Sequence, residues 1–333
     1  MTRETAFRER VSSWALSGEI ADPPRWLVLH QIAQMFPEIA GEKLAGEERR
    51  RTSFTNVVIA DGARELLQAF AAARIAAIPL KGIDVIHRLY GGRESDRRTN
   101  DIDILVAAGS AEKARRITES LGYRQQGEET KAAQARWSKD VTYRREDGVR
   151  AEIHHELMLD MWLTRSYEEL SAAGLIEVGE GSEGWDRLTL EALAIYLLAH
   201  MAAHRFGTDS LRWVLDVCLL LDRFAGRLDR SRLAEAATRL GGRRAAGASV
   251  AALRRMIPAA DSGPLDGLPL ADWREHRALE LIDPVACAVH GEAAWTKRSS
   301  VLCRMLLEPG PLSLGRFAVR KLLLGFSRTK KPD

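Results

Sequence analysis

The stretch PLKGIDVIHRLYGGRESDRRTNDIDILV, residues 79–106, decides the fold. A short aliphatic segment ends at Lys81-Gly82, a helical pattern and a polar loop follow, and a second apolar segment carries Asp101 and Asp103. Two residues two positions apart on a strand face the same side, with Cα atoms about 6–7 Å apart. Their carboxylates would repel by roughly 3 kcal/mol at an effective dielectric constant near 20. Selection for stability alone would not keep this arrangement, whereas Mg²⁺, which prefers hard oxygen ligands, turns the repulsion into attraction.

The residues around the acidic segment test this interpretation, because an isolated Asp-x-Asp is more often the solvated end of a strand. Lys81 and Gly82 lie between a strand and the helical segment IDVIHRLY, so backbone N–H groups and an ammonium meet where an anion could bind. Glu152 follows a hairpin signal at Asp147-Gly148. If its strand lies beside the acidic one, three carboxylates could hold two Mg²⁺ ions for displacement at phosphorus. Judged singly, the Lys81-Gly82 signal is weak, because a helix start with an exposed lysine is common, and a surface glutamate explains Glu152 equally well.

The composition excludes few classes of protein. The chain has 333 residues, 46% hydrophobic and 29% charged, with a net charge of +3, which argues neither for nor against nucleic acid. The widely spaced cysteines, Cys218, Cys287 and Cys303, form no CxxC pair and suggest neither a disulfide framework nor a zinc ribbon. The N-terminus does not resemble a secretory signal, and no apolar run approaches the roughly 20 residues that span a bilayer. We therefore expect a cytoplasmic protein.

The spacing of apolar residues divides the chain into three parts. It is helical at first, including a helix that begins near Asp22, and it changes to short strands after about residue 75. A helix is predicted between Gly109 and Gly122, and helical patterns return after about residue 164. We expect an α+β fold in which a small mixed β-sheet core is flanked by helical regions, divided as 1–65, 66–160 and 161–333.

Four segments together resemble a known family: PLKGIDVIHRLY, RTNDIDILV, AEIHHEL and LLAHMAAHRFGTDSLRWVLDV. They are similar to the bacterial family of uncharacterised nucleotidyltransferases, within the DNA polymerase β-like superfamily, over roughly residues 66–222. Many superfamily members have Gly-Ser where this chain has Lys81-Gly82, although Lys-Gly is typical of the narrower family. Glu152 stands where an aspartate is more usual, so its carboxylate is carried on a longer arm.

The resemblance implies a polymerase β-like core and the transfer of a nucleoside monophosphate from an NTP to a hydroxyl acceptor, with release of pyrophosphate. It implies two Mg²⁺ ions, or Mn²⁺ instead, held by the catalytic carboxylates Asp101, Asp103 and Glu152. It also implies that the phosphates are bound by Lys81, the Gly82 N–H and Arg98.

The histidines have weaker assignments. His154 should share a strand face with Glu152, where it could bind a phosphate or orient that carboxylate, and a structural role is equally compatible. His200 and His204 share a helical face. We interpret them as a packed or substrate-facing pair with Asp216 on the next helix as partner, and the resemblance mildly favours contact with nucleotide or acceptor.

Three other features receive structural interpretations. Arg93 and Arg97 are interpreted as solvated loop charges and Trp213 as a core residue. The basic segment 314–331 is interpreted as a solvated terminal helix, with contact to a membrane surface or nucleic acid as the alternative.

The sequence leaves the acceptor and the identity of the NTP open. A hydroxyl of a small molecule, sugar, peptide or protein is expected, as in antibiotic modification, natural-product tailoring or protein AMPylation. Template-directed polymerisation is not expected, because nothing resembles a duplex-binding module. A catalytically silent nucleotide-binding or partner-binding module and a toxin–antitoxin component that modifies a protein or tRNA are the alternatives.

Overall fold

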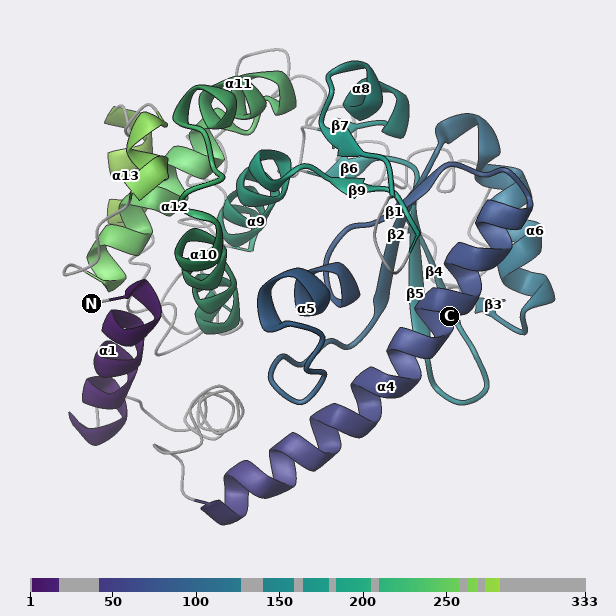
Figure 1. Ribbon diagram of the computed structural model, residues 1–333, viewed down its shortest axis with the longest axis horizontal. Helices are drawn as coiled ribbons and strands as arrows, with labels where there is room; N and C mark the ends of the chain where they lie inside the picture. Colours follow the sequence, from purple (N-terminus) through teal and green to yellow (C-terminus); the bar gives the residue numbers. More distant parts are fainter. Residues whose placement is uncertain are drawn as a thin grey trace, which may run out of the picture.

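A five-stranded mixed sheet lies at the centre of the computed structural model (Figure 1). The structure describes residues 2–17, 42–126, 140–158, 164–179, 184–204, 210–257, 263–268 and 273–281. The strand order is β1-β2-β5-β4-β3, with β1 at Ala77–Pro79, β2 at Ile102–Val106, β3 at Arg124–Gln125, β4 at Asp140–Arg144 and β5 at Arg150–His154. β2 and β5 are parallel, and the other neighbouring pairs are antiparallel. The predicted α+β class is confirmed.

One face of the sheet is covered by two helices that precede and follow β2 in the chain. Ile102, Ile104 and Val106 alternate along β2 and pack in one apolar cluster with α4 (Glu42–Ala72) and α6 (Ala111–Ser120). Their side chains point the same way because strand residues alternate between the two faces. α6 confirms the helix predicted between Gly109 and Gly122.

The opposite face of the sheet meets a second apolar cluster. Leu105 packs there with residues of α5 (Ile83–Tyr90) and of the C-terminal helices. Since Asp103 is two positions from Leu105 on β2, its side chain lies on this face, away from α4. The face of the sheet that carries Asp103 is therefore the one that α5 and the C-terminal helices cover.

The C-terminal helices are arranged around α9 (Leu190–Ala203), whose residues 190–202 are all buried. The others are α10 (Ser210–Phe224), α11 (Arg230–Leu240), α12 (Arg243–Met256) and α13 (Trp273–Leu281). Figure 1 shows the N-terminal helix α1 (Arg3–Ser17) beside this group, and Arg3 pairs with Asp222 of α10 at 2.9 Å. The first helix thus belongs in space with the C-terminal region.

The other elements that the structure describes are short. They are the 3₁₀ helices η1 (Ala108–Ser110) and η2 (Gly263–Gly267), helix α8 (Tyr167–Ala172), and the strand pairs β6 (Leu157–Met158) with β7 (Thr164–Arg165) and β8 (Ile176–Glu177) with β9 (Arg187–Leu188). Ser166 and Glu169 form a capping box at the start of α8. No helix in the described ranges has both the length and the apolar composition to cross a bilayer.

Two sequence predictions lie outside the described residues, namely the helix beginning near Asp22 and the basic segment 314–331. The hairpin at Asp147-Gly148 is confirmed, since β4 and β5 are antiparallel neighbours. The division at residue 65 falls inside α4, which runs unbroken from the N-terminal part onto the sheet.

The interpretation of Arg97 as a solvated charge is wrong. Arg97 is 4% exposed, and its Nε and Nη2 atoms donate to the Asp216 carboxylate at 2.8 Å each. The Tyr90 hydroxyl donates to the same carboxylate at 2.8 Å. Asp216 was expected to pair with His200 and His204, but it joins α10 to the loop before β2 instead, because a buried guanidinium needs a carboxylate partner.

We expect the substitution Asp216→Ala to lower the free energy of unfolding by about 3–5 kcal/mol, since it leaves Arg97 buried without a counter-ion. Chemical denaturation measures this loss. The matched control is Asp96→Ala, which removes the partner of the exposed Arg93 and should cost less than about 1 kcal/mol. Equal effects for the two variants would contradict the role given to the buried pair.

Candidate active site

The turn between β1 and α5 needs glycine. Gly82 caps α5 with a φ of +57°, a conformation that L side chains rarely adopt. A Cβ at this position would also lie 2.8 Å from Thr99 Oγ1. The Leu80 N–H donates to the Asp103 carbonyl at 3.0 Å, which ties the turn to β2. Lys81 is therefore held beside the acidic strand by the backbone hydrogen bond of the residue before it and by the tight glycine turn after it.

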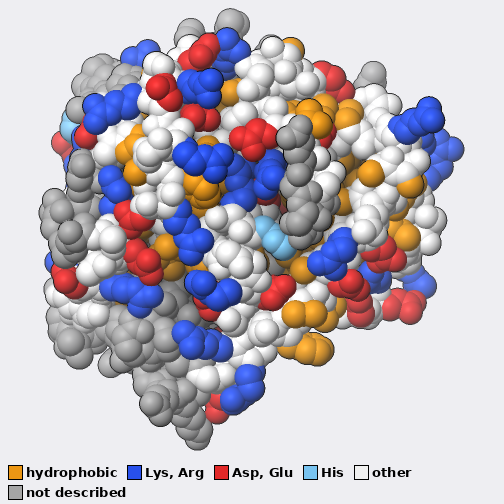
Figure 2. All heavy atoms as spheres, viewed as in Figure 1, with side chains coloured by type: hydrophobic (Ala, Val, Ile, Leu, Met, Phe, Trp, Pro, Cys, Tyr) orange, Lys and Arg blue, Asp and Glu red, His pale blue; other side chains and the backbone are white. Residues whose placement is uncertain are grey.

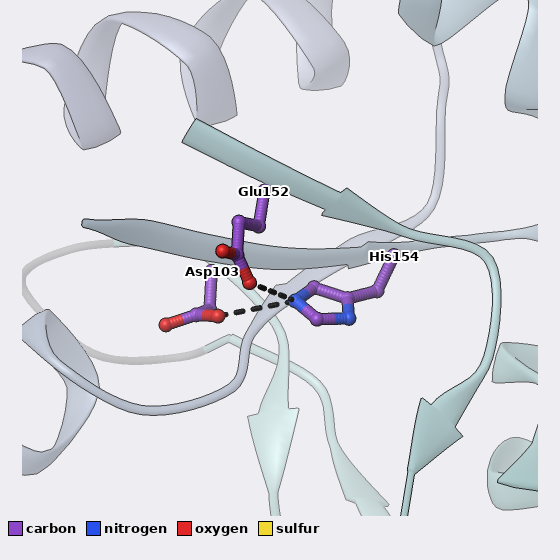
Figure 3. A group of neighbouring side chains, drawn as sticks. All are labelled: Asp103, Glu152 and His154. Atoms are coloured by element: carbon purple, nitrogen blue, oxygen red, sulfur yellow. Dashed lines mark hydrogen bonds and ion pairs between the residues drawn. The ribbon is translucent and has the colours of Figure 1, made fainter. Parts of the chain in front are cut away.

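Asp103 and Glu152 are direct neighbours across the parallel strands β2 and β5. Figure 3 shows both carboxylates and the His154 ring converging from these strands. His154 Nε2 lies 3.1 Å from Asp103 Oδ1 and 3.8 Å from Glu152 Oε2. One ligand atom from each of the three lies within 4.8 Å of the others, so they could share one metal ion. The expectation that Glu152 lies beside the acidic strand agrees with this register.

Asp101 differs from its predicted position. β2 begins at Ile102, so Asp101 lies in the loop just before the strand, and the closest group of possible ligands contains His154 in its place. Arg150, at the start of β5, is 3.5 Å from Asp101 Oδ2 and pairs more closely with Glu152. In the described structure this guanidinium joins the two outer carboxylates.

The carboxylates of the site have opposite pKa shifts. Burial alone would raise the pKa of Asp103, but the Lys81 ammonium and the hydrogen bond from His154 outweigh it and lower the pKa to about 2. Burial, then the like charge of Asp103, raises the pKa of Asp101 to about 6. Lys81 Nζ is 3.4 Å from Asp103 Oδ1, and this charge raises the pKa of Lys81 despite its burial. The site thus gathers more negative charge than its neighbours neutralise.

The side chains present fit a divalent cation. Asp103 Oδ2 is buried and has no hydrogen-bond partner, although a buried carboxylate oxygen normally has one. Asp103 is the cross-strand neighbour of Glu152, its charge acts on nearby Asp101, and hard oxygen ligands of this kind suit Mg²⁺. His154 could complete the set or orient the Asp103 carboxylate from outside it.

Arg98, His200 and His204 were also predicted to be site residues, and their contacts in the structure are with residues outside the group of Asp103, Glu152 and His154. Arg98 donates to Asn100 at 3.0 Å and accepts from Arg212 through its carbonyl oxygen at 3.0 Å. The rings of His200 and His204 are 4.4 Å apart, and both lie against Trp213, at 4.8 and 5.0 Å. The interpretation of Trp213 as a core residue is confirmed, since it is 6% exposed.

Asn56 is a structural residue near the site that the sequence did not predict. It is fully buried on α4, where its amide donates to the carbonyl oxygens of Glu94 and Arg97, both at 2.6 Å, and accepts from the Thr99 N–H at 3.0 Å. These three bonds hold the loop that leads into Asp101. The available signal was an asparagine on the apolar stripe of a helix, where a polar residue needs a partner.

Comparison with known proteins agrees with this geometry. Residues 26–258 match the model of a family described as uncharacterised nucleotidyltransferase. The chain belongs to this family. No curated protein and no solved structure matches the chain. The family match covers the Lys81-Gly82 turn, the acidic strand, β5 and helices α9 to α11, so the resemblance carried by the four sequence segments is confirmed.

The raised pKa of Asp101 predicts that Asp101→Asn stabilises the metal-free protein. Above the folded pKa of about 6 the ionised carboxylate is disfavoured relative to the unfolded chain, whereas below about pH 4 both states are protonated. We expect a gain of about 1–3 kcal/mol at pH 7.5 that nearly disappears at pH 4. Urea denaturation at the two pH values measures it.

Added Mg²⁺ provides the complementary test. It should raise the midpoint of thermal unfolding of the wild type by more than that of Asp101→Asn. Asp61→Asn, which changes a carboxylate that is 80% exposed, is the control and should respond like the wild type. In the urea experiment, a lower free energy of unfolding for Asp101→Asn than for the wild type at pH 7.5 would contradict the raised pKa of Asp101.

Proposed function

We propose that the protein is a Mg²⁺-dependent nucleotidyltransferase that transfers a nucleoside monophosphate from an NTP to a hydroxyl acceptor. The supporting observation is the pairing of Asp103 with Glu152 across β2 and β5, beside the ammonium of Lys81. Carboxylates that face one another next to a positively charged turn suit phosphoryl chemistry, in which positioning and neutralisation of charge lower the barrier. Family membership supports an NTP as the donor.

The roles of the residues follow from their positions. Asp103, Glu152 and Asp101 would hold the Mg²⁺, which when bound neutralises phosphate charge. Lys81 and the Gly82 N–H bind the β- and γ-phosphates. The acceptor oxygen forms a bond to the α-phosphorus, the bond from that phosphorus to pyrophosphate breaks, and Glu152 accepts the hydroxyl proton.

One face of the molecule carries a group of positively charged side chains. On the face drawn in Figure 2, Lys and Arg side chains gather beside a histidine near the middle of the molecule. A positive surface of this kind raises the local concentration of a triphosphate and speeds its association. The acceptor we propose is a hydroxyl of a small molecule, sugar, peptide or protein in the cytoplasm.

A catalytically silent nucleotide-binding module is the second candidate. Arg150 favours it, because its guanidinium pairs with both Glu152 and Asp101 and so offsets part of their charge without a metal. In an active enzyme this arginine has to release the carboxylates or turn toward the phosphates when the nucleotide binds.

Pyrophosphate release separates the two candidates. The protein is incubated with Mg²⁺, each of the four ribonucleoside triphosphates and a cell extract as the source of acceptor. We expect Asp103→Asn to reduce release by about 100-fold or more, because it removes the carboxylate on which the site converges. Glu112→Gln, at a surface carboxylate of α6, is the control and should match the wild type.

Mass spectrometry of the same mixtures should find an acceptor that has gained one nucleotide. Binding of an NTP without release of pyrophosphate would favour the silent module. Equal release by the wild type and Asp103→Asn would exclude this site as the source of activity.

A further inference from the structure

Thr99 lies between two parts of the candidate site, the Lys81-Gly82 turn and the loop that carries Asp101. Its hydroxyl donates a hydrogen bond to the Asp101 carbonyl oxygen at 3.2 Å. A Cβ on Gly82 would lie 2.8 Å from the same hydroxyl oxygen and 3.5 Å from that carbonyl oxygen. The Thr99 hydroxyl therefore lies against the glycine turn and binds the acidic loop at the same time.

Thr99 is itself held firmly by the helices around it. It is 4% exposed, and its backbone N–H donates to Oδ1 of Asn56 on α4 at 3.0 Å. The two residues before it are anchored to α10, Arg97 through Asp216 and Arg98 through its carbonyl oxygen, which accepts from Arg212 at 3.0 Å. Because the segment 97–99 is fixed to two helices, Thr99 can hold the residues that follow it.

Asp101 needs such an anchor. The pairing of β2 with β5 begins at Ile102, so Asp101 lies just outside the strand register. Its carboxylate nevertheless lies at the site, since Oδ2 is 3.5 Å from Nη2 of Arg150, the same nitrogen that pairs with Glu152. The like charge of Asp103 repels this carboxylate. The carboxylate stays beside the others only if the backbone that carries it is prevented from moving away.

We propose that Thr99 is a positioning residue whose hydroxyl fixes the backbone of Asp101 against the Lys81-Gly82 turn. The metal-binding carboxylate and the phosphate-binding turn then keep a constant spacing. The inference rests on the proposed function, because that function assigns Asp101 to the metal. Groups that orient a metal ligand from outside the coordination shell raise the affinity for the metal, since the ligand has less freedom to lose on binding.

The test compares Thr99→Ala with Thr99→Ser in the full-length protein, because the two variants differ from each other only in the hydroxyl. Binding of Mn²⁺, without nucleotide, is measured by electron paramagnetic resonance, in which the signal of free Mn²⁺ falls as the ion binds. We expect Thr99→Ala to weaken Mn²⁺ binding about 10-fold, as loss of an orienting partner does at metal sites. Thr99→Ser keeps the hydroxyl and should bind Mn²⁺ nearly as tightly as the wild type.

Two further variants separate positioning from general stability. Thr118 of α6 is also buried, and its hydroxyl donates to the Ala114 carbonyl oxygen at 2.9 Å, on the face of the sheet away from Asp103. Thr118→Ala is therefore the matched control, which should lower the midpoint of thermal unfolding without changing the affinity for Mn²⁺. Because Thr99 acts through Asp101, adding Thr99→Ala to Asp101→Asn should weaken Mn²⁺ binding little beyond the effect of Asp101→Asn alone.

The outcomes distinguish the inference from the function on which it rests. If Thr99→Ala binds Mn²⁺ as tightly as the wild type, or if Thr118→Ala loses as much affinity, the inference is wrong and the proposed function stands. A full additional loss in the Asp101→Asn background also overturns the inference, because Thr99 would then not act through Asp101. If the wild type binds no Mn²⁺, the metal site of the proposed function is overturned together with the inference.

Discussion

The parallel pairing of β2 with β5 is the constraint on which the site depends. It sets Asp103 opposite Glu152 and Leu105 opposite His154. Because side chains alternate between faces, a shift of β5 by one residue would turn Glu152 and His154 toward α4 and bring Ala151 or Ile153 to the site. The apolar residues between them prevent this shift, since Ala151 and Ile153 are buried against the other face. The apolar core therefore determines the register of β2 and β5, and this register determines which side chains meet at the candidate site.

The side chains that contact the carboxylates of the site come from two places in the chain, the turn after β1 and the two ends of β5. Lys81 follows β1, Arg150 begins β5 and His154 ends it, and each contacts at least one of the carboxylates. One oxygen of Asp103 is nevertheless left without a hydrogen-bond partner, and burial together with the like charge of Asp103 raises the pKa of Asp101 to about 6. A site in this state of partial neutralisation suits a ligand that arrives with its own cations, as a magnesium–triphosphate complex does.

The parts of this arrangement that follow local rules could be predicted from the sequence. Alternation of apolar residues showed the strands, Asp147-Gly148 showed the hairpin, and the acidic pair with Glu152 indicated the site. The partners of buried charges could not be predicted, because they depend on tertiary contacts. Arg97 looked like a loop charge while its carboxylate stood 119 residues away, and Asn56 gave no hint of which loop it would hold. Asp101 was placed on the strand because a period of two does not show where a strand begins.

The buried pair of Arg97 and Asp216 has a consequence for the order in which the chain matures during translation. The strands β2 and β5 can pair once residue 154 has left the ribosome, but the arginine ahead of β2 still lacks its carboxylate at that moment. Until α10 emerges, that guanidinium has to remain hydrated, and the segment that carries it has to stay apart from the hydrophobic interior. Nascent chains that stop short of α10 should consequently pair β2 with β5 but leave the loop before β2 without the ion pair that holds it to the helical region.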